Sequence, residues 1–209
     1  MKQGIIIGTW SGGQESCEVL INSIWDITYP VMIVLNDAPN APEPWKTRLL
    51  EIISDRNWIL CEQPYDGFEI GAIKAAMEVT DWGEFLFLQD TFEIKDINVF
   101  NILFGEFSGT AVAYNPYLQM YLIKYRREGL EKVEFPDVRT KKQSIYQEEQ
   151  FNRAYEKAEG KIHIFNPSFH DGSFYGNHEY RFGRNNLKME DQYLIKRKGT
   201  WTTEQIPLE

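Results

Sequence analysis

The chain has 209 residues, of which 43% are hydrophobic and 14% aromatic, and its net charge is −9. This length and apolar content favour one substantial domain with a packed core over a disordered chain. The negative charge argues against indiscriminate binding to nucleic acid, and the two cysteines are too few for a disulfide framework.

The first apolar run contains only three consecutive isoleucines before a glycine. A run this short can be neither the hydrophobic region of a signal peptide nor a membrane span. We therefore expect a cytoplasmic protein that makes no contact with a membrane.

Four short segments in the first half are rich in Ile, Val and Leu, a pattern typical of parallel strands covered on both faces. They are residues 4–9, 29–37, 58–63 and 84–90. Apolar residues at helical spacing lie between them, in 15–25, 45–53 and 70–77. The alternation predicts an open α/β sheet with right-handed crossovers, an architecture that binds nucleotides at the carboxyl ends of its strands.

The second half continues less regularly. Strand patterns occupy 109–115, 119–125 and 161–167, and a helical pattern runs over 144–160 and ends on a glycine. The segment after residue 167 is polar, aromatic and basic, which predicts a partly irregular C-terminal cap. Since no repeat or linker divides the chain, we expect a single domain over 1–209.

The fourth apolar segment stops abruptly at Gln89, Asp90 and Thr91. A carboxylate at the carboxyl end of a central strand can hold Mg²⁺ or Mn²⁺ while a diphosphate supplies further oxygen ligands. A single aspartate at this place can also be an ordinary turn former. The surrounding sequence has to separate these two interpretations.

This motif and the stretch YDGFEIGAIKAAMEVTDWGEFLFLQD (65–90) resemble the GT-A glycosyltransferases, in particular the large family 2-like group of inverting enzymes that use nucleotide sugars. That family carries an acidic DxD-type motif here, reduced in this chain to one aspartate. The resemblance implies a GT-A (Rossmann-like) open, mostly parallel sheet flanked by helices. It assigns 1–100 to a nucleotide-binding half and 101–209 to an acceptor half with the cap. It also implies a divalent cation, Mn²⁺ or Mg²⁺, on Asp90.

The resemblance further implies which residues approach the donor, a nucleoside diphosphate sugar such as a UDP-sugar. Gly71 permits close backbone approach, and Lys74 together with a helix N-terminus favours phosphate; the alternative is a loop glycine and a solvated lysine. Asp37 would bind the nucleoside or else begin an Asx turn. The donor-binding residues expected on this basis are Thr9, Trp10, Ser11, Asp37, Asp66, Gly71, Lys74, Gln89 and Asp90.

A carboxylate lies on the apolar stripe of the helix predicted over 144–160. Glu148, Phe151 and Tyr155 have the spacing of a single helix face. A carboxylate on an inward face must be paired or used. The resemblance makes Glu148 the catalytic base, with Glu149 as the second choice. The alternative is an exposed acidic pair on the helix surface.

The histidines all lie late in the chain. His163 alternates with isoleucines in a predicted strand, which favours a structural role. The resemblance implies that a late histidine returns to the metal or the diphosphate. His170 is the best-placed candidate for a metal ligand beside Asp90, and His178 is the alternative.

Basic residues gather in two segments. Residues 124–142 contain seven Lys or Arg against four Asp or Glu, a net of +3, and residues 181–198 contain six against two, a net of +4. The tail resembles the end of glycosyltransferases encoded by tailed bacteriophages, some of which modify hydroxymethylated bases in DNA within the host cytoplasm. The uneven charge suggests either a basic face that meets phosphates or two solvated basic segments balanced by acidic helices. The resemblance implies phosphate contacts, either to DNA or to the donor diphosphate. They would come from Arg181, Arg184, Lys188, Lys196, Arg197 and Lys198.

The leading hypothesis is therefore a glycosyltransferase that moves a sugar from a nucleoside diphosphate sugar to an acceptor hydroxyl, with inversion and with help from a metal. Two alternatives remain. One is a nucleotidyltransferase of related fold, although the first loop, TWSGGQES, lacks the Arg or Lys expected of it. The other is a sugar-nucleotide-binding module that has lost its acidic motif and its activity.

Overall fold

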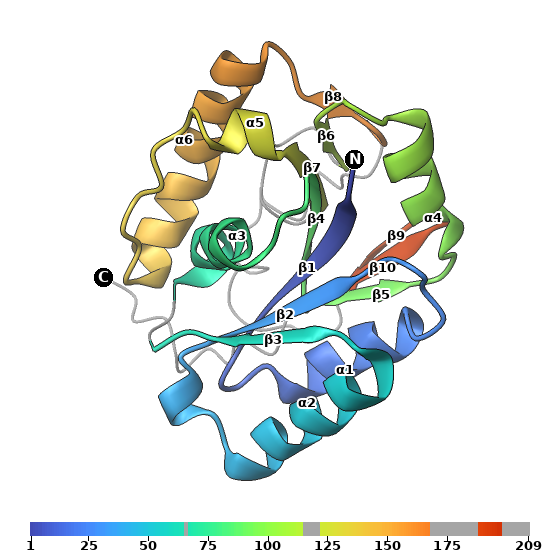
Figure 1. The fold of residues 1–209 in the computed structure, drawn as a ribbon, viewed down its shortest axis with the longest axis vertical. Coiled ribbons are helices and arrows are strands. Elements are labelled where there is room, and N and C mark those ends of the chain that lie inside the picture. Colours follow the sequence, from blue (N-terminus) through green and yellow to red (C-terminus); the bar gives the residue numbers. More distant parts are fainter. Residues whose placement is uncertain (65–66, 115–121, 168–187, 198–209) are drawn as a thin grey trace.

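The structure is a computed structural model, and it describes residues 1–64, 67–114, 122–167 and 188–197 (Figure 1). Within these residues, none of the helices combines the length and the apolar character needed to cross a bilayer. The chain forms a large mixed sheet between two layers of helices, with a second, small sheet against one end of it.

The first half confirms the predicted alternation of strands and helices. Its elements are β1 (Gln3–Trp10), α1 (Gln14–Ser23), β2 (Val31–Asn36), η1 (Ala38–Asn40), α2 (Glu43–Arg56), β3 (Ile59–Glu62), α3 (Phe68–Val79) and β4 (Glu84–Gln89). The segments that form strands are the continuous apolar runs, and those with helical spacing form helices. A strand covered on both faces needs apolar side chains at successive positions.

The second half is less regular, as expected. Its elements are β5 (Phe92–Ile94), α4 (Asn98–Asn101), η2 (Ile102–Glu106), β6 (Val112–Ala113), β7 (Leu122–Arg126), α5 (Arg127–Leu130), α6 (Lys141–Glu159), β8 (His163–Ile164), β9 (Lys188–Glu190) and β10 (Leu194–Arg197). The strands predicted over 109–115 and 161–167 shrink to two residues each. Helix α6 begins earlier than predicted because Thr140 and Gln143 form a capping box at its N-terminus.

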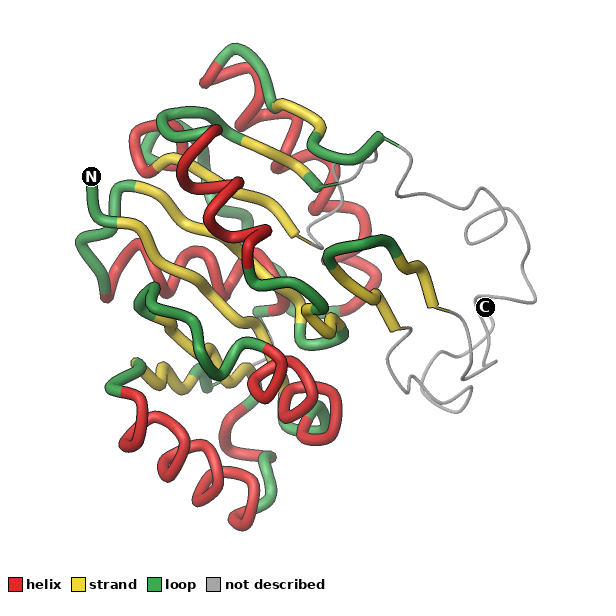
Figure 2. Tube along the Cα trace, turned by 90° about the vertical axis from the view of Figure 1, so that its right-hand side faces the viewer, coloured by secondary structure: helices red, strands yellow, loops and turns green. Residues whose placement is uncertain are grey.

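The large sheet has the strand order β3-β2-β1-β4-β7-β6-β8. Strands β1 to β4 are parallel to one another, and β7 pairs antiparallel with both β4 and β6. This order confirms the predicted open, mostly parallel sheet flanked by helices. The small sheet has the order β5-β10-β9 and joins the segment after β4 to the C-terminal part of the chain (Figure 2).

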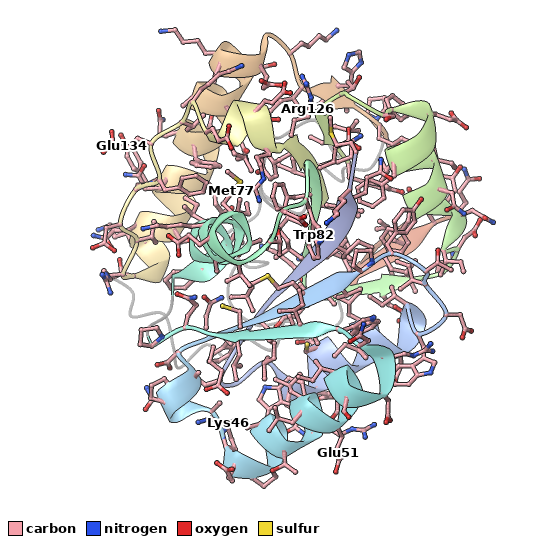
Figure 3. The ribbon with its side chains drawn as sticks, viewed as in Figure 1. Lys46, Glu51, Met77, Trp82, Arg126 and Glu134 are labelled. Carbon is pink, nitrogen blue, oxygen red and sulfur yellow. The ribbon has the colours of Figure 1, made fainter. Side chains whose placement is uncertain are left out.

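Alternate strand residues feed two hydrophobic cores. Ile5, Ile7 and Leu86 point into the core that α1 and α2 cover. Ile6 and Phe87 point into the core that α3 and α6 cover. The outer face of α2 is mostly polar apart from the exposed Leu50, and Figure 3 shows Glu51 on α2, directed away from the sheet.

A charged pair lies inside the sheet, at the amino end of β4. Lys124 and Glu84 are both fully buried, with 3.3 Å between Lys124 Nζ and Glu84 Oε1. The Phe107 carbonyl also accepts from Lys124, at 2.6 Å, and the Gly109 amide donates to Glu84, at 2.6 Å. Burial lowers the pKa of the Lys124 ammonium, and the Glu84 carboxylate opposes that shift. The pair therefore ties β4, β7 and the segment before β6 together.

Replacing Lys124 with methionine should lower the free energy of unfolding by about 3–5 kcal/mol, because it leaves the Glu84 carboxylate buried and unpaired. Chemical denaturation measures the effect. Lys2→Met is the matched control, since Lys2 pairs with Asp81 at the surface, where such pairs contribute about 0–1 kcal/mol. Equal losses in the two variants would contradict a special role for the buried pair.

Candidate active site

Parallel pairing brings three strand ends together. In the register of β1, Trp10 lies opposite Asn36 at the end of β2, and Gly8 lies opposite Gln89 at the end of β4. The carboxyl ends of these strands therefore form one edge of the sheet, where open α/β sheets bind their ligands. Residues that follow them in the sequence meet at this edge.

Asp90 is held tightly at this edge. Its side chain is 7% exposed, and its Oδ2 accepts a hydrogen bond from Thr9 Oγ1 at 2.9 Å. Gly13 packs against the same oxygen: a Cβ there would lie 2.5 Å from Asp90 Oδ2, so only glycine fits. Burial, and next the Asp90 carboxylate, raises the pKa of the neighbouring Cys17 thiol. Asp90 thus joins the start of α1 to the end of β1.

Gln89 begins a chain of polar contacts that leads into the protein. Its amide Nε2 donates to Glu69 Oε1, in the first turn of α3, at 2.6 Å. The Ser144 hydroxyl lies 3.0 Å from Glu69 Oε2 and 3.1 Å from Glu148 Oε1. Because a serine hydroxyl has one proton, the two carboxylates compete for it. Helices α3 and α6 therefore deliver two carboxylates to the end of β4.

The structure separates the two glutamates proposed for the base. Glu148 is buried, at 7% exposed, and lies in the chain of contacts that leads to Gln89. Glu149 is exposed and pairs with Arg153 on the outer face of α6, with 2.8 Å between Arg153 Nε and Glu149 Oε1. The inward direction of Glu148 follows from the helical stripe that it shares with Phe151 and Tyr155, both buried.

Lys196 reaches the strand-end motif from the far end of the chain. Its ammonium donates to Gln89 Oε1 and Thr91 Oγ1 and lies 4.8 Å from the centroid of the Phe92 ring. The side chain is 5% exposed. Lys196 is thus part of the candidate site, because it bonds the two residues that flank Asp90 in the sequence. It does not lie on an open basic face.

The loop after β2 adds further polar groups. Asp37 adopts a left-handed backbone with φ 55, and its carboxylate accepts from Ser11 Oγ at 3.2 Å and from Asn40 Nδ2 at 2.8 Å. Asn36 donates to the Thr9 carbonyl at 3.1 Å, whereas its buried Oδ1 accepts no hydrogen bond within the described part of the chain. Trp10, which pairs with Asn36 in the register of β1 and β2, is half-buried.

Gly71 and Lys74 line a cavity of about 280 Å³ between α3 and the segment that precedes α6. Lys74 is exposed, and Arg139 supplies a second cationic side chain that the sequence did not single out. The remaining lining residues are Gly67, Ile70, Phe135, Pro136, Asp137 and Val138. The cavity begins at the N-terminus of α3, next to Glu69.

The described residues do not fit a divalent cation. Among them, no group of three or more His, Cys, Asp or Glu side chains could hold a metal ion. One carboxylate oxygen of Asp90 is directed at Thr9, and the ammonium of Lys196 bonds the two neighbours of Asp90. A metal on Asp90 and His170 stays a prediction, since His170 lies outside the described residues.

A scan against protein-family models finds no match, and no curated protein sequence matches the chain. Solved structures do match. S. aureus TarS in complex with UDP-GlcNAc has a TM-score of 0.59 and 13% identity, over 78% of this chain and 56% of that one. A mannosyltransferase from Pyrobaculum calidifontis with GDP-Man and Mn²⁺ has a TM-score of 0.58 and 12% identity, over 80% and 55%. The chain has the GT-A fold.

A cytidylyltransferase from Leptospira borgpetersenii also matches, with a TM-score of 0.58 and 14% identity, over 84% of this chain and 79% of that one. This chain spans a little over half the length of the TarS and mannosyltransferase chains. At these identities the likeness establishes the GT-A fold alone. The residues of the candidate site therefore have to carry the argument about chemistry.

The structure places some of the residues predicted for the site near one another, and it adds others. Thr9, Gln89, Asp90, Glu148 and Lys196 lie at one edge, as the contacts above show. Glu69 and Ser144 were missed; an acidic residue between Phe68 and Ile70, at a helix start, was the available signal. Asp66, His170, His178, Arg181, Arg184 and Lys198, and the side chains of Lys188 and Arg197, lie outside the described residues.

Replacing Ser144 with alanine should lower the free energy of unfolding by about 1–3 kcal/mol, because it removes the hydroxyl between two buried carboxylates. Ser54→Ala is the control, since Ser54 is an exposed helical serine in α2 and should change stability by less than about 0.5 kcal/mol. Urea denaturation of both variants makes the comparison. If Ser144→Ala is as stable as Ser54→Ala, the contact chain does not hold α3 and α6 together.

Proposed function

We propose that the chain is a glycosyltransferase that moves a sugar from a nucleoside diphosphate sugar to an acceptor hydroxyl. One observation carries the proposal: the buried carboxylate of Glu148 lies at the carboxyl edge of a GT-A sheet, linked through Ser144 and Glu69 to the end of β4. Solved structures of this fold hold UDP-GlcNAc and GDP-Man, which supports a nucleotide sugar as donor.

Glu148 would act as the general base. It takes the proton of the acceptor hydroxyl while the hydroxyl oxygen forms a bond to the anomeric carbon. The bond from that carbon to the diphosphate oxygen breaks on the opposite face, and its electron pair stays with the diphosphate. A single displacement of this kind inverts the anomeric centre.

The donor would lie along the strand ends. Thr9, Trp10, Asp37 and Asp66 would surround the nucleoside. Lys74, Arg139 and the N-terminus of α3 border the cavity beside Gly71, and cationic groups at a helix N-terminus suit a diphosphate. Gln89 and Asp90 would face the end of the diphosphate that is bonded to the sugar.

The acceptor is less defined than the donor. The hypothesis that the acceptor is a hydroxymethylated base in phage DNA depends on basic residues of the tail. Of these, Arg181, Arg184 and Lys198 lie outside the described residues. Lys196 is buried at the strand-end motif. In that position it would meet the diphosphate of a donor more readily than the backbone of DNA. Hydroxymethylated DNA therefore belongs in an acceptor screen together with glycans and proteins, and salt-sensitive transfer to DNA would support it.

Glu148→Gln should lower the turnover of transfer by about 10²–10⁴-fold, the usual contribution of a general base. A panel of UDP- and GDP-sugars, beginning with UDP-GlcNAc and GDP-Man, is incubated with the chain, and release of UDP or GDP is measured with and without acceptors. Glu149→Gln is the matched control, because it removes the neighbouring exposed carboxylate and should keep full activity. Unchanged turnover in folded Glu148→Gln would contradict the base assignment.

A second candidate function is nucleotidyl transfer, which the length match to a cytidylyltransferase favours. CTP or UTP supplied with sugar phosphates would then release pyrophosphate, whereas a glycosyltransferase would not. Binding of sugar nucleotides without any turnover would instead indicate a binding module.

A further inference from the structure

The hairpin that carries Lys196 has a fixed place in the fold. Asp191 at its turn accepts from the Tyr114 hydroxyl at 2.5 Å and from Asn166 Nδ2 at 2.6 Å. Its other oxygen accepts from the Tyr193 and Leu194 amides, at 2.8 and 3.0 Å. These contacts tie the turn between β9 and β10 to the segments around β6 and β8.

Strand β10 then pairs with β5, directly after the Gln89-Asp90-Thr91 motif. Leu194 lies opposite Ile94 and is fully buried, and Lys196 lies opposite Phe92. The carbonyl of Tyr193 accepts from the Lys95 amide at 2.7 Å. Because β5 begins at Phe92, this register leaves the ammonium of Lys196 next to the strand-end motif. Its position follows from backbone pairing and core packing.

The groups around the ammonium are the kind that also bind metal cations. Gln89 presents its amide oxygen to Lys196 because its amide nitrogen donates to Glu69. Thr91 adds a hydroxyl oxygen, and Asp90 stands between the two in sequence. A buried ammonium is tolerated only where such oxygens satisfy it. The strand end therefore holds a positive charge supplied by the chain itself.

We infer that the ammonium of Lys196 takes the place of a divalent cation beside the donor diphosphate, so that sugar transfer needs no metal. This inference rests on the proposed glycosyltransferase function and adds to it the source of positive charge. When the bond between the anomeric carbon and the diphosphate breaks, the electron pair stays on the terminal phosphate oxygen. Lys196 keeps its proton and stabilises that charge, in a buried setting where the attraction is stronger than in water.

The first test measures wild-type release of UDP or GDP from the donor panel after treatment with excess EDTA, and again after addition of Mn²⁺ or Mg²⁺. The expected result is full turnover in EDTA and no gain from either metal. Loss of turnover in EDTA that Mn²⁺ or Mg²⁺ restores would overturn the inference and leave the proposed function standing. No binding or turnover of any donor, with or without metal, would overturn the proposed function and the inference together.

The second test compares lysine variants in EDTA. Lys196→Met should lower kcat by about 10²–10³-fold, the loss typical of one preorganised group that stabilises transition-state charge, with a smaller change in KM. Lys196→Arg keeps the charge and should recover part of kcat. Lys95→Met is the control, because Lys95 is exposed beside the same small sheet and bonds the Asp191 carbonyl.

Thermal denaturation of each variant separates loss of folding from loss of catalysis. Folded Lys196→Met with wild-type kcat in EDTA would overturn the inference. If Lys196→Met does not fold, the metal titration of the wild-type chain decides without it. A merely structural lysine would not produce metal-free turnover in the wild type together with a selective loss of kcat in the variant.

Discussion

The parallel pairing of β1 with its two neighbours is the constraint on which the candidate site depends. The register sets Trp10 beside Asn36 and Gly8 beside Gln89, so the chain leaves the sheet three times at the same edge. Each exit must satisfy its polar groups without the hydrogen bonds of a strand ladder. Side chains at the exits do this, and they are the same side chains that can meet a ligand.

The charges at this edge are held by contacts between distant parts of the chain. Gln89 and Glu69 are 20 residues apart, Ser144 and Glu69 are 75 apart, and Lys196 and Gln89 are 107 apart. Three carboxylates, those of Glu69, Asp90 and Glu148, and one ammonium are nearly covered here. A network of this kind is stable only while each charged group has a hydrogen-bond or ion-pair partner. An unpaired charge in a low-dielectric interior costs roughly several kcal/mol.

The comparisons and the site support different parts of the conclusion. Similarity to structures that hold nucleotide sugars establishes the GT-A fold and suggests what kind of donor to test. The contrast between buried Glu148 and exposed Glu149 gives the proposal its catalytic residue. The contact of Lys196 with the residues on both sides of Asp90 is the basis of the inference that transfer needs no metal. A fold can host many chemistries, so these contacts decide more than the likeness does.

The sequence by itself determined the alternating strands and helices, because uninterrupted apolar runs and helical spacing are local signals. It also located the strand end at Gln89-Asp90-Thr91, and it placed Glu148 on the inward stripe of α6. The tertiary structure alone decided that Glu69 and Ser144 join these residues and that Lys196 lies between the side chains of Gln89 and Thr91. The reason is physical: such contacts depend on how α3 packs on α6 and how β10 pairs with β5. Local periodicity carries no information about pairings across a hundred residues.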